Sequence, residues 1–205
     1  MVGPPTELLD AAERLIGSRG VEAVSLREIG ATAGHRNNSA AQYHFGTKDR
    51  LLAAVFERRM EPINARRLEL LASVGDGDVR GIVEAWWRPF VEATLVSPPT
   101  GYAGFVAQVV SHPAFETFRT EGRQVTAGLD QVVHRLSAAL SPSVPTRVLG
   151  IRLRLVALAA VNLVADHERR IAAGGGVPAV DAVLADLADA LTGLLTAPVT
   201  EVRRQ

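Results

Sequence analysis

Apolar residues recur every three or four positions along nearly the whole chain, which has 205 residues. The first such stripe runs from Leu8 to Ile16, with Glu7, Glu13 and Arg14 on the other faces. This spacing places the apolar side chains on one side of a helix. No segment of the sequence alternates apolar and polar residues cleanly, as a half-buried strand would. The pattern therefore predicts an all-α fold.

Turn and capping residues divide the first part of the chain into short helices. Gly20 is placed to end the first one, and Ser25 with Glu28 forms a capping pair that begins a second. Gly34 ends this second helix, and a third short helix, capped by an asparagine, runs to about Phe45. The second and third helices, joined by a tight turn, have the layout of a helix-turn-helix module.

A long helix is expected after the break at residues 46–47, and its apolar stripe continues beyond Pro62 with a kink. The remaining helices are expected over residues 79–96, 102–112, 113–140, 146–172 and 180–195. Three short helices followed by a larger helical body predict two domains. These are residues 1–48, which form the helix-turn-helix domain, and residues 49–205.

The third helix of such a module enters the major groove of DNA. Here that segment, residues 37–45, carries Asn, Gln and Ser side chains that can pair with base edges. Its alanines allow close approach to the bases or contact with a thymine methyl group. The other interpretation of this composition is a solvated polar helix end.

The distribution of charge bears on this choice. Lys and Arg total 22, as do Asp and Glu, so the net charge is zero and argues by itself against a DNA partner. However, residues 29–48 hold two basic residues, two histidines and no acidic residue, whereas residues 60–205 hold 15 acidic and 14 basic residues. A surface that meets phosphates must avoid carboxylates, so this local excess favours DNA binding by the N-terminal module.

The composition excludes several other classes of protein. Hydrophobic residues make up 47% of the chain and charged residues 21%, which indicates a sizeable core and not a disordered chain. The absence of cysteine excludes a disulfide scaffold and a thiolate metal site, and it favours a cytoplasmic location. No secretory signal is expected at the N-terminus. The apolar run over residues 155–165 is shorter than the roughly 20 residues that span a bilayer, so no membrane partner is expected.

Two segments together resemble the N-terminal signature of the TetR (tetracycline-repressor-like) transcriptional regulators. They are residues 20–34, GVEAVSLREIGATAG, and residues 43–52, YHFGTKDRLL. The resemblance covers roughly the first 60 residues and is specific, because several spaced positions match in order. It implies a homodimer that binds a double-stranded DNA operator, usually as a repressor, and is released by a small-molecule effector in the C-terminal domain.

The resemblance also implies which residues contact DNA. It places residues 37–43 at the major groove and Tyr43, His44 and Lys48 at phosphates, with Arg27 as a further phosphate contact. Gln42 stands where the family commonly has an aromatic residue. The predicted DNA-binding residues are Arg27, Asn37, Asn38, Ser39, Gln42, Tyr43, His44 and Lys48.

The last two predicted helices carry broad apolar faces with small residues between them, which suits a four-helix interface across a two-fold axis. The alternative is that both helices only close the core of a monomer. The predicted dimer residues are Leu153, Val156, Ala160, Leu163, Val183, Leu187, Leu191 and Leu194.

An effector pocket is expected where aromatic and lone polar side chains gather on apolar helices. Half of the Phe, Tyr and Trp residues fall between residues 86 and 105, and this predominance favours an apolar or aromatic effector. Each candidate can also be an ordinary core residue. The candidates are Trp86, Trp87, Phe90, Tyr102, Phe105, Gln108, Phe118 and Asn162.

Two other functions compete with a regulator. One is a helical small-molecule binding or carrier protein whose N-terminal helices are only structural. The other is a helical enzyme without a cofactor, for which the sequence supplies no recognisable site: His112, His134 and His167 are too far apart for a metal motif, and residues 174–176 lack the lysine of a phosphate loop. We therefore expect no catalytic residue, metal or cofactor.

Overall fold

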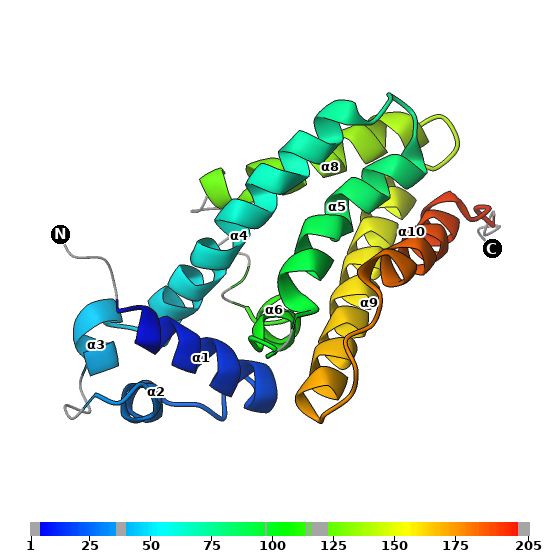
Figure 1. Ribbon diagram of the computed structural model, residues 1–205. Coiled ribbons are helices and arrows are strands. Elements are labelled where there is room, and N and C mark those ends of the chain that lie inside the picture. Colours follow the sequence, from blue (N-terminus) through cyan, green and yellow to red (C-terminus); the bar gives the residue numbers. More distant parts are fainter. Residues whose placement is uncertain (1–4, 36–39, 97, 114, 116–122, 201–205) are drawn as a thin grey trace.

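The computed structural model describes residues 5–35, 40–96, 98–113, 115 and 123–200. The regular secondary structure in these ranges is entirely α-helical, and no strand occurs in them. The predicted all-α class is therefore confirmed. Figure 1 shows a small group of short helices at one end of the molecule and a bundle of longer helices that makes up the rest.

The small group consists of α1 (Thr6–Arg19), α2 (Leu26–Thr32) and α3 (Ala40–Phe45). Half of the capping pair predicted for α2 is observed: the Ser25 hydroxyl accepts a hydrogen bond of 3.2 Å from the backbone N–H of Glu28, whose own carboxylate pairs with Arg19. We call these three helices the N-terminal module.

The connection from α2 to α3 begins at Gly34, whose φ of +79° lies in the left-handed region that favours glycine. Gly34 thus has the turn conformation that the sequence predicts for it. The asparagine cap expected for α3, at residue 37 or 38, lies outside the described residues.

α4 (Lys48–Ser73) joins the N-terminal module to the body of the molecule. Thr47 caps it by accepting a hydrogen bond of 3.2 Å from the Arg50 N–H. Pro62 lies inside the helix, which continues through it as the apolar stripe predicts. A single helix therefore runs from the edge of the module far into the body (Figure 1).

The other described helices are α5 (Val79–Thr94), α6 (Tyr102–Val109), α8 (Arg123–Leu140), α9 (Thr146–Ala172) and α10 (Val180–Thr196). The sequence places four of these helices within a few residues of their observed ends. Of the helix predicted over 113–140, α8 covers residues 123–140.

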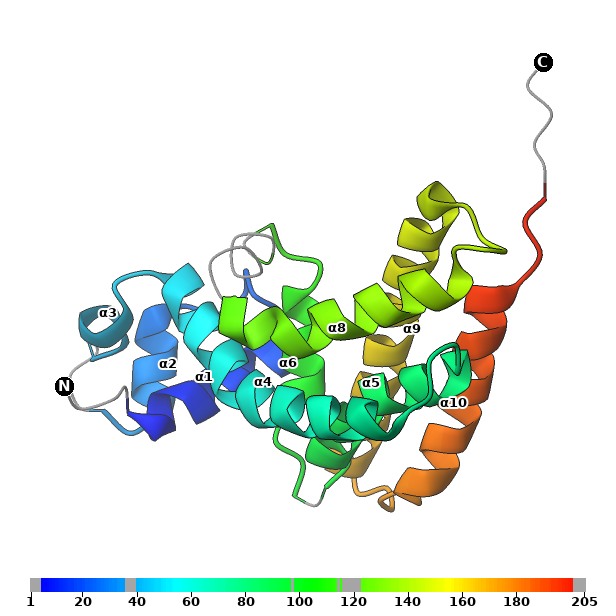
Figure 2. The ribbon, with the colours of Figure 1, turned by 90° about the horizontal axis from the view of Figure 1, so that it is seen from above.

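The body is arranged around α5, which packs against α4, α8, α9 and α10. α6 packs against α1 on one side and α9 on the other, so it lies between the module and the body (Figures 1 and 2). Buried apolar residues of the module and the body form one continuous core.

α9 is apolar along most of its length. By length and composition alone it could cross a membrane, and it is the one such helix in the described ranges. In the structure it packs against α5, α6, α8 and α10.

Candidate nucleic-acid interface and ligand cavity

The outer face of α3 is polar and aromatic and is open to solvent. Tyr43 is 83% exposed, and Gln42 and His44 beside it are also exposed, whereas Ala41 and Phe45 point into the core. The rings of Tyr43 and His44 meet edge to face, with 5.3 Å between their centroids. One side of this short helix therefore anchors it, and the other presents hydrogen-bonding groups to a partner.

The remaining predicted DNA-binding residues occupy different positions. Arg27 is exposed on α2. The side-chain amide of Gln42 donates to the carbonyl of Gly46, at the end of its own helix. Asn37, Asn38 and Ser39 lie outside the described residues.

Lys48 has a structural contact that the sequence does not reveal. Its Nζ donates a hydrogen bond of 2.9 Å to the carbonyl of Val21, in the loop between α1 and α2. This bond ties the start of α4 to the N-terminal module. An ammonium group has three donors, so two remain for a phosphate.

A buried carboxylate strengthens the joint between α1 and α4. Glu13 is 1% exposed, and its two oxygens accept hydrogen bonds from Arg59 at 2.8 and 2.9 Å and from Arg58 at 3.1 Å. The hydrogen bond with Glu13 raises the pKa of Arg59 above its ordinary value. Arg59 also lies over the ring of the buried Tyr102, 6.0 Å from its centroid. Sequence periodicity places Glu13 on a polar face of α1, so its burial could not be foreseen.

α6 forms a second joint with α1, through glycines. A Cβ atom at Gly17 would lie 2.4 Å from the carbonyl oxygen of Gly101, and one at Gly104 would lie 2.8 Å from the carbonyl oxygen of Gly17. The Glu168 carboxylate caps the start of α6 by accepting hydrogen bonds from the N–H groups of Gly101 and Gly104 at 2.8 and 2.9 Å. Burial raises the pKa of Glu168 above its ordinary value. The two helices therefore touch at backbone distance, and α9 holds the end of α6 in place.

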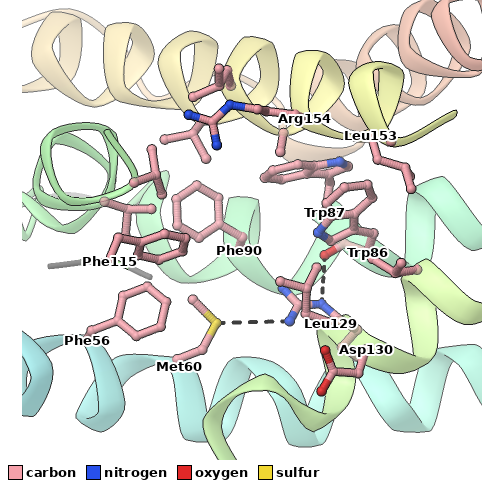
Figure 3. A pocket seen from close by; sticks show the side chains of 18 residues that line it. Phe56, Met60, Trp86, Trp87, Phe90, Phe115, Leu129, Asp130, Leu153 and Arg154 are labelled. Carbon is pink, nitrogen blue, oxygen red and sulfur yellow. Dashed lines mark hydrogen bonds between the residues drawn. The ribbon is translucent and has the colours of Figure 1, made fainter. Parts of the chain in front are cut away.

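A cavity of about 400 Å³ lies in the body, between α4, α5, α6, α8 and α9. Figure 3 shows its aromatic wall, which includes Phe56, Trp86, Trp87, Phe90 and Phe115. The two indoles stack with centroids 4.9 Å apart, and Phe56 meets Phe115 edge to face at 5.8 Å. A cavity of this size and lining suits a small, largely apolar molecule.

Arg67 brings a positive charge to this wall. The residue is 3% exposed. Its Nε donates to the carbonyl of Trp86 at 3.1 Å, and one terminal nitrogen donates to the side-chain oxygen of Asn64. Burial lowers the pKa of Arg67 to about 10. The sequence offers no sign of this residue's position, because an arginine on a long helix is ordinarily a surface residue.

The predicted pocket residues are distributed over several places. Trp86, Trp87 and Phe90 line the cavity. Tyr102 and Phe105 are instead fully buried on α6, with their rings stacked on each other at 6.0 Å. The other three are elsewhere: Gln108 and Asn162 are exposed, and Phe118 lies outside the described residues.

Other residues that line the cavity are not predicted from the sequence. Phe56 and Met60 belong to a stripe that the sequence identifies only as an apolar helix face, and Leu153 is predicted instead as a dimer residue. Their common signal is a large apolar side chain on one of the facing helices. This signal becomes informative only when the pairing of the helices is known.

The predicted dimer residues divide between the interior and the surface of the chain. Val156, Ala160, Leu187 and Leu191 are buried within the single chain, and Leu153 and Val183 are half-buried. Leu163 and Leu194 are exposed. α9 exposes two further large apolar side chains that were not predicted, Ile151 at 71% and Leu155 at 49%. α9 thus has two apolar faces, and the sequence pointed mainly to the one that α5, α6 and α10 cover.

No three His, Cys, Asp or Glu side chains in the described ranges are grouped so that they could hold a metal ion. The structure therefore combines an exposed short helix, α3, with two tight contacts that hold α1 of the same module against α4 and α6. An apolar cavity lies in the body beyond these contacts.

Comparison with known proteins agrees with this arrangement. Residues 8–55 match the family of bacterial regulatory proteins called the tetR family. A comparison with curated proteins gives no match. The solved structures that resemble the chain include a Shewanella sp. PV-4 protein assigned to the TetR family, which has a TM-score of 0.63 at 18% identity and covers 93% of this chain and 95% of its own.

Two further similar structures are named for a ligand or a pathway. The fatty acid degradation regulator FadR of Bacillus halodurans has a TM-score of 0.59 at 14% identity, over 92% of this chain and 94% of its own. AibR in complex with isovaleryl coenzyme A and operator DNA has a TM-score of 0.54 at 16% identity, over 95% and 98%. These likenesses show the fold, and the family match covers the helix-turn-helix module. By that match the N-terminal module corresponds to the tetR family of bacterial regulatory proteins, and the chain as a whole has the fold of solved TetR-family regulators.

Proposed function

We propose that this protein is a ligand-responsive repressor. It binds a palindromic operator as a homodimer, and a small molecule with a largely apolar or aromatic body releases it from DNA. The observation that carries the proposal is that two helices, α4 and α6, each run between the cavity and the N-terminal module. The protein acts in the cytoplasm, without a cofactor and without catalysis.

The DNA-contacting surface is the open side of α3 with its surroundings. Gln42 and residues 37–39 read base edges, while Arg27, Tyr43, His44 and Lys48 contact phosphates. The exposure of Arg27 and of the three α3 side chains supports this assignment. Residues 1–48 act as the DNA-binding domain, and residues 49–205 bind the effector and the second subunit.

The signal passes along the two joints. α4 carries Phe56 and Met60 at the cavity and Lys48 at the module. α6 carries Val106 at the cavity, and its Gly104 touches α1. Because both contacts with the module are tight, a ligand that displaces either helix tilts the module and changes the distance between the two α3 helices of a dimer.

The fold of AibR, whose solved complex contains both an acyl coenzyme A and operator DNA, supports a regulator with a ligand site and a DNA site on one chain. The competing function is a carrier protein whose N-terminal helices are only structural. The two differ in their behaviour toward salt. Binding to phosphates releases counterions, so a regulator loses affinity for duplex DNA steeply as the salt concentration rises.

A salt titration of duplex binding tests this proposal. Arg27→Ala and Lys48→Ala should each reduce the slope of log affinity against log salt by about one unit, because each removes one phosphate contact. Arg147→Ala, which removes an exposed arginine at the start of α9, is the matched control and should leave the slope unchanged. Duplex binding that is absent in the wild type, or insensitive to salt, would favour the carrier function.

A further inference from the structure

The cavity wall is apolar except at a few points, and Arg67 is the charged group that lies deepest in it. No carboxylate in the described ranges lies within salt-bridge distance of its guanidinium. The other ion pairs of α4 show what such a partner looks like, since Arg58 and Arg59 both meet the carboxylate of Glu13. Among the described residues, Arg67 is therefore a buried cation held only by neutral groups.

The hydrogen bonds of Arg67 leave part of its donor set unused. Its Nε and one terminal nitrogen are occupied by Trp86 and Asn64. The other terminal nitrogen has no acceptor among the described residues. Trp87 adds a second unused donor, because its Nε1 is buried without a partner in the same part of the chain. The guanidinium of Arg67 and the Nε1 of Trp87 are both hydrogen-bond donors, so the complementary ligand supplies acceptors.

A buried charge without a counter-charge is costly, because the interior solvates it poorly. Burial lowers the pKa of Arg67 to about 10, which still leaves the group protonated near neutral pH. The cavity thus keeps a cation beside stacked indoles. An anion placed there would restore the lost solvation and raise the pKa of Arg67 again.

Two other charged residues line the cavity, Asp130 and Arg154. Both are exposed, and their charges are opposite. Water screens such groups, so they contribute little to the selection of a ligand's charge. The buried arginine therefore dominates the electrostatics inside the cavity.

We propose that the effector is an amphipathic organic acid whose single carboxylate pairs with Arg67 and whose apolar body packs against Trp86, Trp87 and Phe90. The proposal rests on the proposed function and names the chemical class of its effector. The cavity, at about 400 Å³, is more than twice the volume of roughly 150 Å³ that holds a benzene ring. An alkyl chain of medium length or one to two aromatic rings fits this space.

Arg67 also has a structural role, since it links α4 to the backbone of α5 through Trp86. The test must therefore separate charge recognition from folding. Trp86 and Trp87 are the only tryptophans of the chain, so intrinsic fluorescence reports ligand binding at the cavity directly. The probes are decanoate, phenylbutanoate and naphthylacetate, each compared with its uncharged amide near neutral pH.

The wild-type protein should bind at least one of these acids about 10- to 100-fold more tightly than the matching amide, as expected for a charge-assisted pair. Arg67→Gln should remove this preference and leave the affinity for the amide unchanged, whereas Arg67→Lys should keep part of it. Arg154→Gln, which removes the exposed arginine of the same cavity, should keep all of it. If Arg67→Gln does not fold, the proposal is tested by comparing the affinity of the wild type for each acid with its affinity for the matching amide.

Equal binding of acids and amides, no binding of any acid, or an acid preference that survives Arg67→Gln would overturn the proposal. The same titrations, repeated with operator DNA present, separate it from the proposed function. If the acids bind through Arg67 but leave DNA affinity unchanged, the regulatory function fails and the ligand class stands. If amides release DNA as well as acids do, the ligand class fails and the regulatory function stands.

Discussion

Glu13 shows how a single charged residue can hold two parts of this molecule together. It lies on α1 of the N-terminal module, yet its carboxylate is buried and faces two arginines of α4. Asp10 adds an ion pair of 2.8 Å with Arg58 at the edge of the cluster. An ion-paired carboxylate in this position fixes the angle between α1 and α4, which a purely apolar contact would leave freer to slide.

Glu13→Gln should lower the free energy of unfolding by about 2 to 3 kcal/mol, because it leaves two arginines without their shared counter-charge. The loss is smaller than the roughly 3–5 kcal/mol of a fully buried pair, since both arginines are partly exposed. Urea unfolding followed by circular dichroism measures it. Glu7→Gln, at an exposed position of the same helix, is the control and should change stability little. A stability equal to that of the wild type would contradict the role assigned to Glu13.

At the scale of elements, α1 and α6 touch through backbone atoms. Because the nearest atoms to a Cβ at Gly17 belong to the backbone of Gly101 and Phe105, a side chain there cannot be accommodated by a change of rotamer. α6 carries Val106 of the cavity wall on the same eight-residue helix. A movement of α6 therefore displaces α1 as well, because no space separates the two helices at this contact.

Gly17→Ala should lower the free energy of unfolding by about 1 to 3 kcal/mol, because the added methyl group forces the two helices apart. Helix propensity alone predicts the opposite sign, a gain of up to about 1 kcal/mol. Gly193→Ala, in α10, isolates that gain, since nothing lies within 4 Å of a Cβ at that position. Thermal or urea unfolding of both variants gives the comparison. Stabilisation of Gly17→Ala to the same degree as Gly193→Ala would show that the contact is loose.

Much of this element-level arrangement follows from local sequence signals, and some of it cannot. The capping pair at Ser25 and the turn at Gly34 are encoded within a few residues, so helix ends and breaks are predictable. The cavity depends on which faces of five helices meet, and periodicity does not contain that information. α9 illustrates the limit: Val156 and Leu155 are both apolar and adjacent in sequence, but one is buried by other helices and the other is half exposed.

At the scale of the whole molecule, the proposed repressor needs two copies of α3 at a fixed separation. The surface available for pairing is the open side of α9 and α10, with Ile151, Leu155, Leu163 and Leu194 as its large apolar residues. Apolar side chains that remain exposed on two adjacent helices suit a four-helix dimer interface. A dimer built in this way has two-fold symmetry, and its operator is expected to have the same symmetry.

Binding of a palindromic operator by a dimer is tested most directly by selection of bound duplexes from a random pool, with the wild type and Leu155→Glu in parallel. The wild type should enrich a palindrome whose half-sites lie about one DNA turn apart or slightly more. Leu155→Glu places a charge in the proposed dimer interface and should sediment as a monomer and lose the palindrome. Ala72→Glu, at an exposed position near the end of α4, is the control and should behave as the wild type. Enrichment of no sequence by the wild type, or of the same palindrome by a monomeric Leu155→Glu, would contradict the account.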